Sequence, residues 1–145
     1  MRIALKILTL CVALVIAGCS TDRATKEAIR RAETIAREMP DSALVLIESL
    51  DPQNVRGEDD KAHYRLVEAE VLYYNRILPD REEVAQPLFD HYLTSNDHRE
   101  RARAMYQYAL VMQAEGENAE ALYALLEAEK SLELCKYLDK PRLQG

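Results

Sequence analysis

The sequence predicts an all-α protein. Apolar residues recur at helical spacing through most of the chain, and no segment alternates apolar and polar side chains in the way that a half-buried strand does. The chain has only five prolines and four glycines, and most of them stand between the periodic segments. We expect about six helices in one domain over residues 24–145, after an export signal.

Residues 1–18 have the order of charge and hydropathy that defines an export signal. Arg2 and Lys6 come first, and an apolar run from Ile7 to Ala17 follows them. This run is roughly half of the 20 apolar residues that a membrane-spanning helix needs. We therefore interpret it as a removable signal and not as a transmembrane anchor.

The segment Val15-Ile16-Ala17-Gly18-Cys19 resembles the lipobox of bacterial lipoproteins. The resemblance implies that Cys19 carries lipid, including palmitate, and becomes the first residue of the mature chain, with residues 19–23 as a short polar linker. Two or three acyl chains would hold the protein firmly, because each buried methylene contributes about 0.8 kcal/mol. Ordinary secretion, with cleavage after Ala17, is the alternative.

The composition narrows the classes of partner. The chain carries 19 Lys and Arg against 25 Asp and Glu, a formal charge of −6, and losing Arg2 and Lys6 makes it −8. Nucleic acid is therefore excluded as a partner, because its binding depends on clustered basic side chains. After processing, Cys135 is the only thiol free to react, so the fold must rest on packing and not on an internal disulfide.

Prolines divide the first half of the domain. A first helix is predicted over residues 22–38, and it ends before Pro40. The second covers residues 41–50 and ends before Pro52, and a polar loop follows. Three acidic residues then open a third helix, over residues 58–77, where the helix dipole favours negative charge.

Capping residues mark the helices of the second half. Asp80 and Glu83 have the spacing of a capping box at the start of the fourth helix, which carries its apolar side as far as Tyr92. Asp97 is a candidate cap for a fifth helix over residues 98–115, and Gly116 is expected to end it. The sixth helix is predicted over residues 118–137.

The helices recur in pairs of about 38–40 residues, which suggests an internal repeat. In residues 102–135, four small residues lie where two helices would cross or turn: Ala109, Gly116, Ala121 and Ala128. These residues match four positions of the tetratricopeptide repeat (TPR), which this segment resembles. The resemblance implies antiparallel helix pairs stacked as an α-solenoid.

The match is incomplete elsewhere. Met105 replaces the family's aromatic residue, Glu133 replaces its proline, and the units at residues 24–57 and 62–99 are degenerate. A generic helical bundle is the alternative. The lipobox, the segment Pro40–Leu50 and the tyrosine-rich helices together resemble TPR lipoproteins typical of Bacteroidota, which implies a cell-envelope scaffold outside the cytoplasm, with the outer membrane favoured.

The TPR resemblance also points to partner-binding residues. In that family the first helix of each pair lines a concave groove, which places Arg103, Tyr106 and Gln113 as candidates for contact with a protein or peptide. The eight tyrosines suit either interfaces or the spaces between stacked helices. We expect most of them in the core: Tyr64, Tyr73, Tyr74, Tyr92, Tyr106, Tyr108, Tyr123 and Tyr137.

Nothing in the sequence favours an enzyme, a metal site or a small-molecule cofactor. The glycines are too scattered for a phosphate-binding loop, and the chain has no zinc-binding pattern. We interpret His63, His91 and His98 as partly exposed helix residues, and Cys135 as a small packing residue.

The last predicted helix leaves part of its apolar side uncovered, at Leu122, Leu125, Leu126 and Leu132. Solenoids normally end in a polar capping helix. We therefore expect that a further helix begins at Pro141 or that this side meets a partner. A second hypothesis follows, in which the chain is the sensory N-terminal part of an envelope signalling protein.

Replacing the lipobox cysteine tests the anchor. Cys19→Ala should leave the full chain without lipid, so that cell fractionation finds it in the soluble fraction and labelled palmitate is not incorporated. Ser20→Ala, which leaves the lipobox intact, should behave like the wild type. Unchanged membrane partitioning of Cys19→Ala would contradict lipid anchoring.

Overall fold

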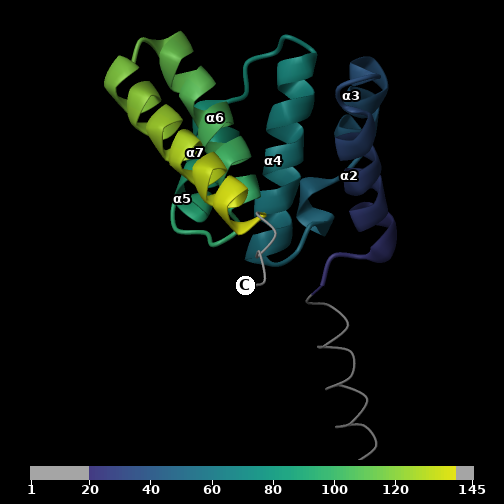
Figure 1. Ribbon diagram of the computed structural model, residues 1–145. Helices are drawn as coiled ribbons and strands as arrows, with labels where there is room; N and C mark the ends of the chain where they lie inside the picture. The colour runs from purple at the N-terminus through teal and green to yellow at the C-terminus, as the bar shows by residue number, and fades with distance from the viewer. Residues whose placement is uncertain (1–19, 140–145) are drawn as a thin grey trace, which may run out of the picture.

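Six α-helices make up the fold in the computed structural model, which describes residues 20–139 (Figure 1). They are α2 (Arg23–Ile35), α3 (Pro40–Glu48), α4 (Glu58–Tyr74), α5 (Gln86–Tyr92), α6 (His98–Glu115) and α7 (Asn118–Leu138). No strand occurs in this range, so the all-α prediction is confirmed. None of these helices combines the length and the apolar character that crossing a bilayer requires. The export signal and Cys19 lie outside the described residues.

The helices pack as three consecutive pairs. Helix α2 packs on α3, α4 packs on α5 and the short turn before it, and α6 packs extensively on α7. The first helices of the pairs are neighbours, because α4 contacts both α2 and α6. In Figure 1 the pair α2–α3 lies at one edge of the array, α4 in the middle, and α6 with α7 at the other edge.

The predicted capping residues lie at the helix ends where they were expected: Asp80 and Asp97 at starts, and Gly116 at an end. The carboxylate of Asp80 accepts a hydrogen bond from the backbone N–H of Glu83 at 2.8 Å. Asp97 accepts from the N–H groups of Arg99 and Glu100, at 3.1 and 3.0 Å. Gly116 closes α6 in the left-handed conformation, with a φ of 84° that glycine adopts without a steric penalty.

The fourth predicted helix begins differently from the expectation. Residues Arg81–Ala85 form a π-helical turn, η2, in which the N–H of Ala85 reaches the carbonyl of Asp80 at 3.0 Å. A regular α-helix here would need an N–H from Pro87 for the carbonyl of Glu83, and proline has none. The wider turn lets the chain pass this proline and continue as α5.

Small residues make the close helix contacts possible. Ala109, Ala121 and Ala128 are all buried, as the repeat pattern predicted. Helix α2 was predicted to continue to residue 38, but it ends at Ile35 and leaves Met39 exposed. Its buried side is instead built on residues such as Ile29.

The chain is already fixed to the helical array immediately before α2. The hydroxyl of Thr21, which is buried, donates to the carbonyl of Arg56 at 2.9 Å and accepts from the N–H of Arg56 at 2.7 Å. Asp22 then caps α2 through the N–H and hydroxyl of Thr25. Residues 19–23 were predicted to be a linker. From Thr21 onward this segment is instead hydrogen-bonded to the rest of the fold, at the loop before α4.

Candidate functional site

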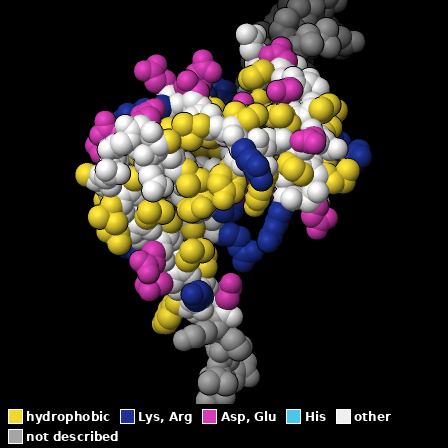
Figure 2. Space-filling view, turned by 90° about the horizontal axis from the view of Figure 1, so that it is seen from above, with side chains coloured by type: hydrophobic (Ala, Val, Ile, Leu, Met, Phe, Trp, Pro, Cys, Tyr) yellow, Lys and Arg dark blue, Asp and Glu magenta, His cyan; other side chains and the backbone are white. Residues whose placement is uncertain are grey.

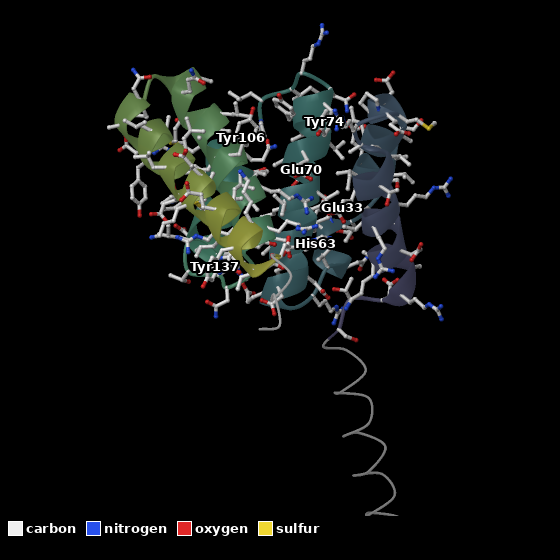
Figure 3. All side chains as sticks on the ribbon, in the orientation of Figure 1. Glu33, His63, Glu70, Tyr74, Tyr106 and Tyr137 are labelled. Carbon is white, nitrogen blue, oxygen red and sulfur yellow. The ribbon has the colours of Figure 1, made fainter. Side chains whose placement is uncertain are left out.

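Helices α2, α4 and α6 together form one surface, which we call the first-helix face. Figure 3 shows Tyr74 and Tyr106 towards one end of it, Glu70 between, and Glu33 and His63 further along. Two groups of side chains occupy this face. One is an ionic network, made of Glu33, His63, Glu70, Glu100 and Arg103, which the buried Tyr92 joins from α5. The other is a tyrosine cluster, made of Tyr73, Tyr74 and Tyr106.

Arg103 is the centre of the ionic network. Its guanidinium, on α6, donates from Nε and Nη2 to both carboxylate oxygens of Glu70 on α4, at 2.7 and 2.6 Å. Nη2 also donates to Glu33 on α2, at 2.7 Å. A forked pair of this kind is among the stronger charged hydrogen bonds, because the planar guanidinium matches the carboxylate. These hydrogen bonds, first those to Glu70, raise the pKa of Arg103.

His63 forms the second half of the network. Its Nδ1 lies 3.1 Å from a carboxylate oxygen of Glu100, and its Nε2 lies 3.4 Å from Glu33. Glu100 also accepts from the Tyr92 hydroxyl at 3.1 Å. Only the doubly protonated imidazolium can donate from both ring nitrogens at once. The arrangement therefore favours charged His63.

The pKa values follow from these contacts. The hydrogen bond to Glu100 raises the pKa of His63, with further help from the negative charge of Glu33 and against the effect of burial and of Arg103. The same hydrogen bond lowers the pKa of Glu100. Burial, with the nearby Glu100 charge, raises the pKa of Tyr92, which stays a neutral donor.

The network leaves this face anionic. Three carboxylates stand against one guanidinium, so the group carries a net negative charge whether or not His63 is ionised. Its charged side chains keep between 16% and 33% of their surface exposed, so solvent and ligands can reach them. A cationic group would be attracted here.

The tyrosine cluster is exposed. Tyr73, Tyr74 and Tyr106 keep 41%, 40% and 40% of their surfaces accessible. The ring of Tyr73 meets those of Tyr74 and Tyr106 edge to face, with centroids 5.4 and 6.2 Å apart. Seen from above, hydrophobic side chains spread across the molecule, Lys or Arg side chains lie near its middle, and acidic ones stand mostly around its rim (Figure 2).

The structure places the three sequence-predicted contact residues differently. Tyr106 is exposed in the tyrosine cluster, and Gln113 is exposed further along α6. Arg103 lies on the same face, but its Nε and Nη2 donate to Glu33 and Glu70, so it links helices. The expectation that most tyrosines belong to the core is wrong: five of the eight are exposed.

The partners of Arg103 were missed in the sequence. Glu33 lies 70 residues from Arg103 along the chain, and no local pattern connects them. A weaker sign was present, because His63 and Glu70 lie two turns apart on one predicted helix, and Glu100 and Arg103 lie one turn apart on another. Each pair therefore shares a helix face, although the pattern does not show that the faces meet.

A surface pocket lies away from the first-helix face. It has a volume of about 410 Å³ and lies between α4, the 3-10 turn Pro52–Asn54 and η2. Burial raises the pKa of Glu68 there, and it raises the pKa of Tyr64 to about 12. Both groups are lining residues. Because it mixes acidic and basic side chains without a nucleophile and base in contact, this pocket indicates no particular chemistry.

No protein-family model, curated protein or solved structure matches this chain. Its function must therefore be inferred from its residues and their geometry. Over residues 20–139, no group of three or more His, Cys, Asp or Glu side chains is placed to hold a metal ion.

The ionic network makes stability depend on pH. Ionised His63 stabilises the fold fully below its unfolded pKa of 6.5, and this stabilisation is lost as the pH rises through the raised folded pKa. The contribution of Glu100 is complete above 4.5 and is lost as the pH falls through its lowered folded pKa. We therefore predict that His63→Gln lowers the free energy of unfolding more at about pH 5.5 than at about pH 8.5.

His91→Gln is the matched control, because its partner Asp59 is fully exposed and the pair is 3.6 Å apart. Chemical unfolding of both variants at the two pH values measures the difference. An equal loss for His63→Gln at both pH values would contradict a stabilising charged His63.

Proposed function

We propose that the chain is a lipid-anchored helical-repeat scaffold that binds a protein or peptide partner on its first-helix face at the cell envelope. The observation that carries this proposal is the exposed tyrosine cluster beside the anionic network. Tyrosine is enriched in binding interfaces because it offers a large apolar area with a polar tip.

Helix packing supports a repeat of the TPR type. Three successive pairs stack so that their first helices are neighbours, which is how a solenoid presents a continuous binding face. In the pair α6–α7, Gly116 makes the left-handed turn, and the small residues at the crossing points, such as Ala109 and Ala121, are buried.

The chemistry of the face favours a particular peptide. The edge-to-face tyrosines suit an apolar or aromatic side chain, and their ring faces also attract cations. Glu33 and Glu70 leave an anionic surface further along the same face. A segment with an aromatic residue and, close to it, Lys or Arg would satisfy both parts.

The docking of Thr21 supports a short attachment to the membrane. Only Ser20 separates Thr21 from Cys19, and Thr21 is hydrogen-bonded to Arg56 near the start of α4. A lipid on Cys19 would therefore hold the helical array close to the bilayer, with the starts of α2 and α4 at the membrane side.

A peptide selection tests the proposal. The full chain, held in lipid nanodiscs, is used to select binders from a random peptide library, and their affinities are measured by fluorescence anisotropy. We expect selected peptides to be rich in aromatic residues with Lys or Arg. Tyr106→Ala should weaken their binding about tenfold or more, since truncating a hot-spot tyrosine costs about 2 kcal/mol or more.

Tyr137→Ala is the matched control, because Tyr137 is 73% exposed but lies outside the tyrosine cluster (Figure 3). It should leave the affinity unchanged. Equal losses for the two variants, or a library without enrichment for cationic and aromatic residues, would contradict binding at the first-helix face.

A further inference from the structure

Helix α7 leaves an unusually large apolar surface uncovered. Its exposed large residues are Leu122, Tyr123, Leu125, Leu126, Leu132, Leu134, Tyr137 and Leu138. The helix packs on α6, at the edge of the array (Figure 1). Exposed apolar patches of this kind commonly mark interaction sites.

A groove runs along this edge between α6 and α7. It has a volume of about 410 Å³, and Tyr106 contributes to it from α6. Leu125, Ala128 and Leu132 line it from α7, and Ala128 is small enough to let another backbone come close. The groove meets the tyrosine cluster only at Tyr106.

In the first two helix pairs, a helix of the following pair covers the surface that corresponds to this groove. Helix α4 packs against both helices of the pair before it, α2 and α3. Helix α6 does the same against α4 and the segment η2–α5. The groove between α6 and α7 is the equivalent position for the third pair, and no helix among residues 20–139 fills it.

The charges at the groove define its occupant further. Glu129 and Glu133 line it beside the leucines, with Lys136 towards one end. An occupant with basic side chains along its edges would complement these carboxylates. A lipid surface fits poorly, since bacterial anionic headgroups would meet the same carboxylates.

A second copy of the chain also fits poorly. Two α7 helices would bring like-charged glutamates together. The exposed side of α2, at the opposite edge, is polar and offers no apolar stripe, with Arg23, Lys26, Arg30 and Arg31 among its residues. The polar outer side of α2 is typical of a capping helix at the end of a repeat array, whereas the outer side of α7 is apolar.

We propose that the groove between α6 and α7 binds an amphipathic α-helix of a partner protein, with a Leu- or Ala-type stripe flanked by Lys or Arg. This helix lies against the third pair as α4 and α6 lie against the first two, by the helix-in-groove mode of recognition. The groove shares Tyr106 with the tyrosine cluster, but its leucines lie on α7, apart from the first-helix face.

Two synthetic helical peptides of equal length test this site. They share one Leu and Ala stripe, and one has Lys flanks where the other has Glu. We expect the Lys peptide to bind the full chain in nanodiscs, by fluorescence anisotropy, at least tenfold more tightly than the Glu peptide. Leu132→Glu should weaken binding of the Lys peptide about tenfold or more, through loss of a buried leucine contact.

Leu126→Glu is the matched control, because it lies on the same helix with 54% exposure against 50% for Leu132, but outside the groove. It should bind the Lys peptide like the wild type. The double variant Glu129→Lys with Glu133→Lys should reverse the preference between the two peptides, which a merely unfolded protein could not do.

Four results would overturn the proposal. One is equal binding of both peptides to the wild type, and another is equal loss in Leu126→Glu and Leu132→Glu. The third is a dimer in sedimentation that Leu132→Glu dissociates, since a second copy would then occupy the groove. Loss of binding in Tyr73→Ala with no loss in Leu132→Glu would place the peptide on the first-helix face instead.

Discussion

Arg103 makes the interaction on which the rest of the arrangement depends, because its guanidinium joins three helix pairs. It lies on α6 and binds Glu70 on α4 and Glu33 on α2. Simple exposed ion pairs contribute at most about 1 kcal/mol. This one is forked, half-buried and shared by two carboxylates, which makes it stronger and fixes the relative positions of the first helices.

The same interaction sets the character of the first-helix face. Aligning α2, α4 and α6 brings His63 between Glu33 and Glu100, and it leaves more carboxylates than cations on the surface. On the same face, Tyr106 of α6 meets Tyr73 of α4, above a shared apolar core of the two helices. The ionic network and the exposed tyrosine cluster are two groups of side chains that lie next to each other on this face (Figure 3).

Much of the fold could be predicted from local chemistry. Prolines and caps such as Asp80, Asp97 and Gly116 act within a few residues, so they mark helix ends in the sequence itself. The π-helical turn before α5 was not expected, although Pro87 supplies its cause. The stacking of the pairs depends on contacts between distant residues, and the periodicity of one helix does not specify its neighbour.

The candidate site was less predictable for the same reason. Tyr106 was expected at a binding surface from its repeat position, and its side chain is exposed on the first-helix face, which leaves partner binding a prediction. Arg103 was expected to meet a partner, but it binds carboxylates that lie 33 and 70 residues away. The tyrosine cluster could not be predicted from residue type, because tyrosine suits both the core, as at Tyr64, and the surface, as at Tyr73.

A double-mutant cycle between Arg103 and Glu33 tests the central claim most directly. The free energy of unfolding is measured for the full chain, for Arg103→Gln, for Glu33→Gln and for the double variant. The account predicts a coupling energy of about 1 kcal/mol or more. The exposed pair Glu27 and Arg30, within α2, serves as the control and should show much less. An Arg103–Glu33 coupling no larger than that of the control would contradict the role assigned to Arg103.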